Sequence, residues 1–271
     1  MATILKTKNV FLTGGACGLG KGFTDSLLAA AARVIFTDVN RTAAEATEKE
    51  FQDKYGKDNV KFIECDVTDG PKFEETFQTA ISFLGHVDLM VNNAGMMVES
   101  KWERMIDVNY KGVVRGTLMA VEHMRQDKGG KGGRIINISS EAGLKEMIFM
   151  PIYGGTKHAV RCFTSCLATA PDVKAQGIEY GTLCPGPVDT DLIRNLDETK
   201  IRHSNLMQPE RLKERTSSVE RLQEAFMKLV LLEEMNKAIL YVDSKEENFY
   251  EMKANNLGPT WPADSTDLSS Q

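Results

Sequence analysis

The feature that most constrains the fold of this chain is a short apolar run followed at once by glycines. Asn9–Thr13 (NVFLT) is apolar enough to form a buried strand, and Gly14, Gly18 and Gly20 come directly after it. A helical pattern then runs over Gly20–Ala32. The sequence therefore predicts a strand that feeds a helix through a tight, glycine-rich turn.

The same alternation of short β-rich runs and longer helical patterns continues along the 271 residues. We expect further strands at residues 33–38, 60–66, 87–92, 134–139, 179–184 and 238–242. Helices are expected at residues 42–55, 71–84, 102–125, 151–171 and 220–233. This order predicts an α/β fold, a single Rossmann-type doubly wound parallel sheet of about seven strands with helices on both faces.

The composition argues against several classes of protein. Hydrophobic residues make up 42% of the chain, enough for one large core, and the net charge of −5 offers no basic face for nucleic acid. Residues 1–9 lack the apolar run of a signal peptide, and no stretch reaches the roughly 18 apolar residues of a membrane span. The five cysteines and four histidines form no disulfide framework or metal motif. We therefore expect reduced thiols, a cytoplasmic location and no catalytic metal.

The glycine-rich turn has the chemistry of a phosphate-binding site. Glycines let the backbone turn tightly and approach a pyrophosphate closely, and the N-terminus of the following helix offers free N–H groups. We expect the phosphates of a nucleotide at Gly14, Cys17, Gly18, Leu19 and Gly20. An ordinary strand–helix turn is the alternative, because glycine-rich turns are common.

Asp38 indicates which nucleotide binds. It ends the predicted second strand about twenty residues after the last glycine, where a carboxylate hydrogen-bonds the adenosine ribose and repels a 2′-phosphate. Asp38 therefore favours NAD over NADP, and its neighbour Val39 is expected to contact the cofactor as well. Two alternatives stay open: Asp38 caps the next helix, or Arg41 offsets the repulsion of a 2′-phosphate.

Two other strand ends are expected at the same crevice, where they add the cofactor contacts Cys65, Asp66, Val67, Asn93, Ala94 and Gly95. Asp66 can accept a hydrogen bond from the adenine amine. Small residues at 94 and 95 let a cofactor lie against the backbone. For Asn92, which ends the fourth strand, turn chemistry is an equally good interpretation.

A candidate proton-transfer group follows the fifth strand. Tyr153 and Lys157 are four residues apart on a predicted helix and so face one side, and Ser140 ends the strand before it. Tyr241 and Lys245 have the same spacing, but they lie at a predicted strand rather than on a helix and have no such serine before them. The first pair is therefore the catalytic candidate.

The residue types suit transfer of a proton from an alcohol. A free tyrosine has a pKa near 10, and an ammonium group nearby favours its phenolate. Tyr153 would then take the alcohol proton while Ser140 holds the substrate oxygen. Lys157 would also bond the nicotinamide ribose. Asn109, a poor residue for a helix interior, would hold a water that links Lys157 to solvent, unless it is simply an exposed helix position.

Over about residues 8–245 the chain resembles the short-chain dehydrogenase/reductase family. The resemblance is carried by Thr13–Gly20, Asp38, Asp66, Asn92–Gly95, Asn109, Ser140, Tyr153, Lys157, Pro185, Gly186 and Thr190. It implies a catalytic tetrad of Asn109, Ser140, Tyr153 and Lys157. It also implies a cytosolic homodimer or homotetramer that binds NAD, with Pro185, Gly186, Val188 and Thr190 at the nicotinamide end.

Within the family, residues 99–143 are most similar to the branch of NAD-dependent 15-hydroxyprostaglandin dehydrogenases, and residues 153–165 also resemble insect-type alcohol dehydrogenases. Three positions depart from the family pattern. Met150 stands where prostaglandin-specific enzymes carry a glutamine that contacts substrate, and it cannot donate that bond. Ala31 replaces the usual glycine after the first helix. Glu141 would raise the pKa of Tyr153 if it points inward.

An apolar pocket for a hydrophobic alcohol or ketone is expected at Met96, Met97, Met147, Ile148, Phe149, Met150, Leu192 and Ile193. Core filling is an equally good interpretation of the methionines. We expect one dinucleotide-binding and catalytic domain over residues 1–257, with a mobile lid at about 189–218. Residues 258–271, rich in Pro, Ser and Asp, are expected to form a flexible tail.

Three functions are compatible with these residues. The first is an NAD-dependent dehydrogenase of a hydrophobic secondary alcohol or its ketone, with Tyr153 as general base or acid. The second is an NADPH-preferring carbonyl reductase, in which Arg41 offsets Asp38. The third is a nucleotide-binding protein of the same fold without turnover, against which the complete tetrad argues.

Overall fold

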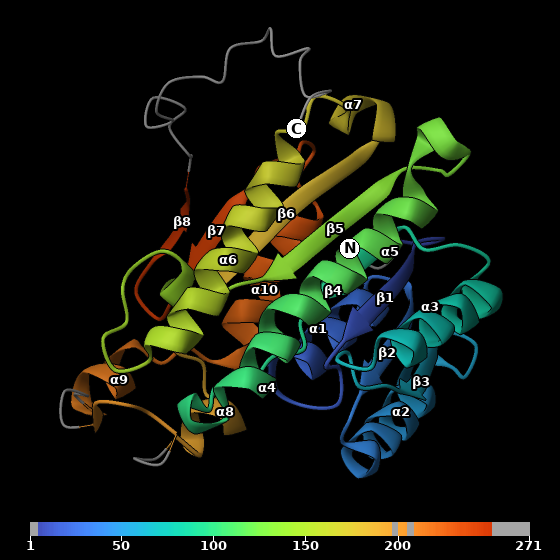
Figure 1. Cartoon of the computed structure of the whole chain (residues 1–271). Coiled ribbons are helices and arrows are strands. Elements are labelled where there is room, and N and C mark those ends of the chain that lie inside the picture. The colour runs from blue at the N-terminus through green and yellow to red at the C-terminus, as the bar shows by residue number, and fades with distance from the viewer. Residues whose placement is uncertain (1–4, 197–199, 205–208, 251–271) are drawn as a thin grey trace, which may run out of the picture.

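The computed structural model describes residues 5–196, 200–204 and 209–250. Its centre is one eight-stranded sheet in the order β3-β2-β1-β4-β5-β6-β7-β8, parallel except for the antiparallel pair β7–β8. The strands are β1 (Asn9–Thr13), β2 (Arg33–Asp38), β3 (Val60–Glu64), β4 (Leu89–Asn92), β5 (Gly133–Ile138), β6 (Ile178–Pro185), β7 (Ile239–Val242) and β8 (Glu247–Phe249). The sheet is therefore doubly wound, as predicted (Figure 1).

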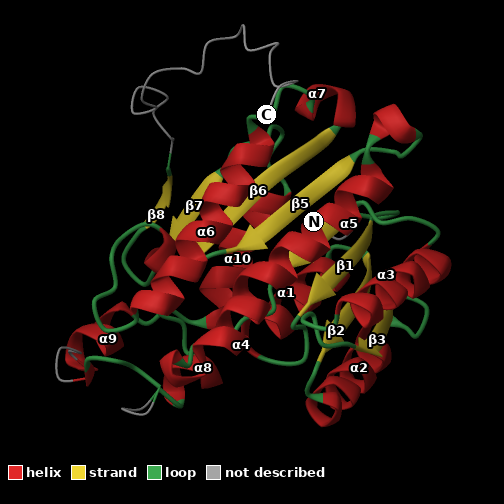
Figure 2. Ribbon diagram, viewed as in Figure 1, coloured by secondary structure: helices red, strands yellow, loops and turns green. Residues whose placement is uncertain are grey.

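Helices cover both faces of the sheet (Figure 2). The longer ones are α1 (Gly18–Ala29), α2 (Arg41–Tyr55), α3 (Gly70–Leu84), α5 (Val113–Met124), α6 (Pro151–Ala168) and α10 (Val219–Val230). Shorter ones are α4 (Trp102–Ile106), α7 (Val173–Gln176), α8 (Asp191–Arg194) and α9 (Pro209–Arg215). In the described part of the chain, no helix is long and apolar enough to cross a membrane.

Alternation along the strands feeds two separate cores. Val10 and Leu12 of β1 point to a core completed by α1, α2 and α10, whereas Phe11 between them points to the core of α3, α5 and α6. All three β1 side chains are fully buried. A strand buried on both faces needs an unbroken apolar run, which is why β1 shows no polar alternation.

The structure differs from the sequence predictions at several boundaries. An eighth strand adds to the expected seven, β3 ends at Glu64, and α6 ends at Ala168. The single helix expected over 102–125 is interrupted by a π-helical turn, η2 (Asp107–Gly112). Ala31, which replaces the usual glycine after the first helix, itself lies in the left-handed region with φ of 69°, directly after the C-cap Ala30 of α1.

The predicted lid at 189–218 contains α8 and α9. Residues 197–199 and 205–208 of that segment lie outside the described residues, as do the predicted tail at 258–271 and the last seven residues of the predicted domain. Backbone bonds join the two ends of the segment: the Asp189 N–H donates to the carbonyl of Ser217, and the Ser217 N–H donates to the carbonyl of Pro187, just before the segment.

Candidate active site

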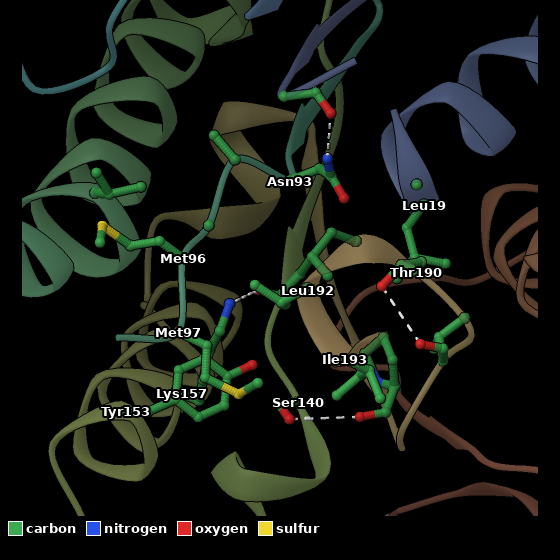
Figure 3. Close-up of a pocket in the computed structure, with 18 of the residues that line it drawn as sticks. Leu19, Asn93, Met96, Met97, Ser140, Tyr153, Lys157, Thr190, Leu192 and Ile193 are labelled. Atoms are coloured by element: carbon green, nitrogen blue, oxygen red, sulfur yellow. Dashed lines mark hydrogen bonds between the residues drawn. The ribbon is translucent and has the colours of Figure 1, made fainter. Parts of the chain in front are cut away.

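A cavity of about 900 Å³ opens at the carboxyl ends of the strands. The strand order reverses between β1 and β4, the place where doubly wound sheets bind ligands. Figure 3 shows Leu19 and Asn93 at one end of the cavity and Ser140, Tyr153 and Lys157 at the other. Every residue predicted to contact the cofactor lines it: Gly14, Cys17, Gly18, Leu19, Gly20, Asp38, Val39, Cys65, Asp66, Val67, Asn93, Ala94, Gly95, Tyr153, Lys157, Pro185, Gly186, Val188 and Thr190.

The glycine-rich turn needs its glycines for two distinct reasons. Gly14 and Gly18 have φ of 71° and 53°, in the left-handed region that other residues avoid. Gly20 has an ordinary φ, but a Cβ there would lie 1.8 Å from the carbonyl oxygen of Gly14. The first reason is backbone conformation and the second is close packing of the turn on itself.

Asn93 and Thr13 hold the turn against the end of β4. The Asn93 side-chain amide donates to the carbonyls of Thr13 (3.0 Å) and Gly14 (2.8 Å). The Thr13 hydroxyl in turn accepts from the N–H groups of Asn93 and Ala94, each at 3.1 Å. These four bonds lock two adjacent strand ends together. The N-cap residue of α1, Cys17, makes no side-chain capping bond to the first turn of that helix.

The Asp38 carboxylate is partly used by the protein itself. It accepts from the N–H of Ala16 (3.0 Å) and from that of Asn40 (2.9 Å). The N-cap of α2 is Asn40, whose side chain accepts from the N–H of Ala43. The alternative that Asp38 caps this helix is therefore wrong, because Asn40 has that role. The first bond orients Asp38 towards the glycine-rich turn.

Asp66 lies in a tighter set of bonds than its sequence suggests. Its carboxylate accepts from both the N–H (2.9 Å) and the hydroxyl (2.8 Å) of Thr68 and forms an ion pair with Arg104. Arg104 comes from α4 and lines the same cavity. An adenine amine would thus meet a carboxylate whose two oxygens already have partners.

The predicted catalytic side chains meet at the end of β5. The Ser140 hydroxyl accepts from the N–H of Ala142 (3.2 Å) and donates to the carbonyl of Pro185 (3.5 Å). Lys157 donates to the carbonyl of Ile138 (3.0 Å), and its Nζ lies 5.8 Å from the centre of the Tyr153 ring. All three residues are buried, yet they line the cavity.

Burial dominates the proton affinities here. It raises the pKa of Tyr153 to about 12; a hydrogen bond from Ser140 opposes the rise, and the Glu141 carboxylate adds to it. Burial also lowers the pKa of Lys157 to about 8. The sequence led us to expect a phenol of lowered pKa beside the ammonium. In the protein by itself that expectation is wrong, because loss of solvent is the largest influence on the Tyr153 pKa and raises it.

Asn109 is fully buried, so the alternative of an exposed helix position is wrong. Its side chain bonds the N–H (2.8 Å) and carbonyl (2.9 Å) of Met96 and the hydroxyl of Thr156 (3.2 Å). A Cβ on Gly95 would lie 3.5 Å from Asn109 Oδ1 and 3.6 Å from Lys157 Nζ. Asn109 therefore faces the lysine across Gly95, from the π-helical turn.

Comparison with known proteins agrees with this geometry. The sequence model of one family, described as short chain dehydrogenase, matches residues 8–201. This chain belongs to that family. It is 34% identical to a mouse (Mus musculus) protein named 15-hydroxyprostaglandin dehydrogenase (NAD(+)). The alignment runs over 191 residues and covers 70% of this chain and 71% of the relative. A Staphylococcus epidermidis protein named diacetyl reductase ((S)-acetoin forming) is 32% identical over 204 residues, 72% of this chain and 77% of the relative.

The fold also matches a solved structure, that of a short chain dehydrogenase/reductase from Burkholderia phymatum in complex with NAD. The TM-score is 0.75, with 22% sequence identity, over 88% of this chain and 89% of the other. The sheet and its helices are therefore those of the short-chain dehydrogenase family, and the chain is an oxidoreductase of that family.

The apolar end of the cavity of this short-chain dehydrogenase contains most of the predicted pocket residues: Met96, Met97, Met147, Phe149, Met150, Leu192 and Ile193. Ile148 does not line it and is 61% exposed. Met97, Met150 and Tyr153 also form a small core with Met105. The methionines thus serve both interpretations, since they fill a core and face the cavity.

Charged residues at the same end were not predicted as part of the site. Lys101, Lys145 and Arg215 line the cavity, and the buried carboxylate of Glu141 pairs with Lys145 (2.8 Å) and Arg215 (2.7 Å). Arg215 also pairs with Asp243 (2.8 Å). Glu141 was flagged by its position beside Ser140, but nothing in the local sequence points to Arg215. In the part of the chain that the structure describes, no three His, Cys, Asp or Glu side chains are grouped as metal ligands.

Proposed function

We propose that this chain is an NAD-dependent dehydrogenase that interconverts a hydrophobic secondary alcohol and its ketone. The observation that carries the proposal is the meeting of Ser140, Tyr153 and Lys157 at one end of a cavity whose other end is the glycine-rich turn. A hydroxyl, a phenol and an ammonium group beside an apolar pocket match the needs of proton transfer to or from a bound alcohol oxygen.

The residues present fit a dinucleotide. The N-terminus of α1 has no side-chain cap, and its first residues line the cavity, so its N–H groups suit a pyrophosphate. Pro185, Gly186, Val188 and Thr190 suit the nicotinamide end, beyond Lys157. When bound, the nicotinamide would accept or supply the hydride. The relative named as an NAD(+) enzyme supports the same choice of cofactor.

Charge at the ribose end favours NAD over NADP. Arg41, the residue that would offset Asp38, pairs instead with Glu45 (2.7 Å) and Glu64 (3.5 Å). A 2′-phosphate would meet the Asp38 carboxylate, while the guanidinium of Arg41 is already shared by the carboxylates of Glu45 and Glu64. Surface pairs of this kind are weak, so their effect lies in the sign of the local charge rather than in their strength. The NADPH-preferring reductase is therefore the second choice.

The side chains would divide the work as follows. Ser140 holds the substrate oxygen. Its present bond to the carbonyl of Pro185 is long, at 3.5 Å, so the hydroxyl can turn from that carbonyl to the substrate. Tyr153 exchanges a proton with that oxygen, as acid in ketone reduction and as base in alcohol oxidation. Lys157, which has its pKa lowered to about 8, stays mainly protonated at neutral pH and stabilises a phenolate. Asn109 fixes the loop at Met96 and faces Lys157.

The test is Tyr153→Phe, which removes the proton donor and keeps the ring. We expect kcat to fall by at least about 10²-fold, the loss that follows removal of a general acid or base. Activity is followed by NADH absorbance on 2-octanol, menthol, a hydroxysteroid and a hydroxy fatty acid. The binding of NADH, measured by fluorescence, should change little, which separates lost chemistry from lost folding.

Three outcomes would contradict the proposal. Retention of full activity in Tyr153→Phe would leave the phenol without a chemical role. Equal or tighter binding of NADPH than NADH would favour the carbonyl reductase. A wild-type protein that binds NADH but turns over none of the four alcohols or their ketones would support a nucleotide-binding protein without catalysis.

A further inference from the structure

A buried carboxylate outside the predicted site contacts the backbone of the proposed catalytic tyrosine. Glu99 begins the short 3-10 helix η1 (Glu99–Lys101) and is 6% exposed. Its Oε1 accepts from the N–H of Tyr153 at 2.8 Å, and its Oε2 from the N–H of Ile152 at 3.3 Å. Both oxygens are therefore spent on the first turn of α6.

The first turn of α6 needs an acceptor that its own sequence does not supply. The N-cap position is Met150, which has no side-chain acceptor, and Pro151 has no N–H. The free donors of the turn are thus Ile152 and Tyr153, because Gly154 bonds the carbonyl of Met150 at 2.9 Å. Glu99, 54 residues earlier in the chain than Tyr153, fills the place of a capping side chain.

The carbonyl of the same tyrosine is held from the other side. Thr156 donates its hydroxyl to the Tyr153 carbonyl at 2.7 Å, and that hydroxyl accepts from the amide of Asn109 at 3.2 Å. The peptide groups on both sides of Tyr153 are therefore bonded to side chains, one from η1 and one from the next turn of α6. Glu99 is also attached to the segment that follows α8, since its N–H donates to the carbonyl of Lys200 at 2.9 Å.

We propose that Glu99 is a positioning residue for the reaction: it caps α6 from a distant segment and so fixes the Tyr153 phenol relative to Ser140 and the substrate oxygen. The inference rests on the proposed role of Tyr153. Its physical basis is that a displacement of about 1 Å at a reacting group can cost about 10²-fold in rate. A carboxylate at the N-terminus of the 18-residue α6 also complements the helix dipole.

The experiment is a series at one position: Glu99→Gln, Glu99→Asp and Glu99→Ala. Gln keeps one carbonyl oxygen at the same reach, so its kcat should stay within about threefold of the wild type. Asp is one methylene shorter and Ala has no acceptor, so kcat should fall by about tenfold or more in each, with the dissociation constant of NADH within about twofold. Rates are measured on the fastest of the four alcohols named above.

The matched control is Asp69→Ala. Asp69 caps α3 by accepting from Lys72 at 3.1 Å and does not line the cavity. This variant should lose stability to the same degree as Glu99→Ala, about 1 kcal/mol by thermal or urea unfolding, with kcat unchanged. A fall in kcat in the control equal to that in Glu99→Ala would reduce Glu99 to a general stabilising cap and overturn the inference.

The pH dependence distinguishes positioning from a change in proton affinity. In the Asp and Ala variants of Glu99 the plateau of kcat should fall while the midpoint of the pH–rate profile stays in place. A displaced midpoint with an unchanged plateau would overturn the inference, as would equal losses in the Gln and Ala variants.

If Glu99→Ala does not fold, the comparison of kcat between Glu99→Asp and Glu99→Gln decides. Full activity in Tyr153→Phe would contradict the proposed function itself. Full activity in Glu99→Ala, with Tyr153→Phe inactive, would contradict only the inference about Glu99.

Discussion

The two ends of the cavity are built from different materials. The end under the glycine-rich turn is made mainly of backbone, held by bonds such as those from Asn93 to the carbonyls of Thr13 and Gly14. The end beyond Tyr153 is lined by flexible apolar side chains, among them Met97 and Met147. The tightly packed, hydrogen-bonded backbone of the turn has only one arrangement. A methionine side chain, in contrast, has three rotatable bonds and can pack in many ways.

This difference suggests how the two ends respond to change. An added methyl group at the backbone end has no space to enter, so we expect losses that are large and nearly complete. At the apolar end, neighbouring side chains can rearrange around a smaller or larger group, so we expect graded effects on substrate affinity. The same fold would thus keep one cofactor while its substrate changes between relatives.

The largest expected effect comes from a single methyl group, in Gly20→Ala. Its Cβ would lie 1.8 Å from the carbonyl oxygen of Gly14 and 2.6 Å from Asn93 Nδ2, so the turn must open. We expect NADH affinity to fall by at least about 10²-fold and the free energy of unfolding to drop by about 1–3 kcal/mol. NADH fluorescence and urea unfolding measure the two quantities.

The matched control is Gly155→Ala, which lies between the two proposed catalytic side chains of α6. Nothing lies within 4 Å of a Cβ placed there. Alanine favours a helix over glycine by about 1 kcal/mol, so this variant should be as active as the wild type and slightly more stable. Loss of activity in Gly155→Ala, or its retention in Gly20→Ala, would remove the contrast between the two ends.

The backbone end was largely predictable because its signals are local. A strand, a glycine-rich turn and a helix N-terminus follow one another within Asn9–Ala29, and Asp38 closes the next strand. The positions of these residues depend on the regular βα order, which hydrophobic periodicity reveals. The same order placed Ser140, Tyr153 and Lys157 at one crevice.

The contacts that adjust the site were not predictable, because they join residues far apart in the chain. Glu99 reaches Tyr153 across 54 positions, Arg215 reaches Glu141 across 74, and Arg104 reaches Asp66 across 38. Each partner arrives on a loop or short helix whose placement follows from tertiary packing rather than from any periodic pattern. Likewise, burial reversed the expected sign of the Tyr153 pKa, since desolvation depends on the whole surrounding fold.

A medium effect is expected from Glu141→Gln, which changes charge at the apolar end without changing shape. The Glu141 carboxylate raises the pKa of Tyr153, so its neutralisation should lower that pKa. Alcohol oxidation needs the phenolate and therefore rises with pH through this pKa. The rising limb of the pH–rate profile should move to lower pH in the variant, and oxidation at neutral pH should become faster.

Lys145→Met should shift the rising limb of the pH–rate profile in the opposite direction. Lys145 pairs with Glu141 at 2.8 Å and is about half exposed. Without this cation, the carboxylate acts more strongly on Tyr153, and the rising limb should move to higher pH by a smaller amount, because solvent screens the exposed ammonium. Shifts in the same direction for both variants would show that Glu141 acts through the packing of α9 and Arg215 rather than through its charge.

The smallest effect is expected from Leu192→Ala. Leu192 lines the apolar end from α8 and is 43% exposed, so a bound alcohol would cover it only in part. Loss of that contact is worth about 1 kcal/mol, or a rise in KM of roughly fivefold, with kcat and NADH affinity unchanged. Leu231→Ala, at a leucine that is 40% exposed and lies outside the cavity, is the matched control and should leave KM unchanged. A fall in NADH affinity in Leu192→Ala, with KM for the alcohol unchanged, would show that α8 contacts the cofactor. Leu192 would then belong to the cofactor end of the cavity rather than to the apolar end.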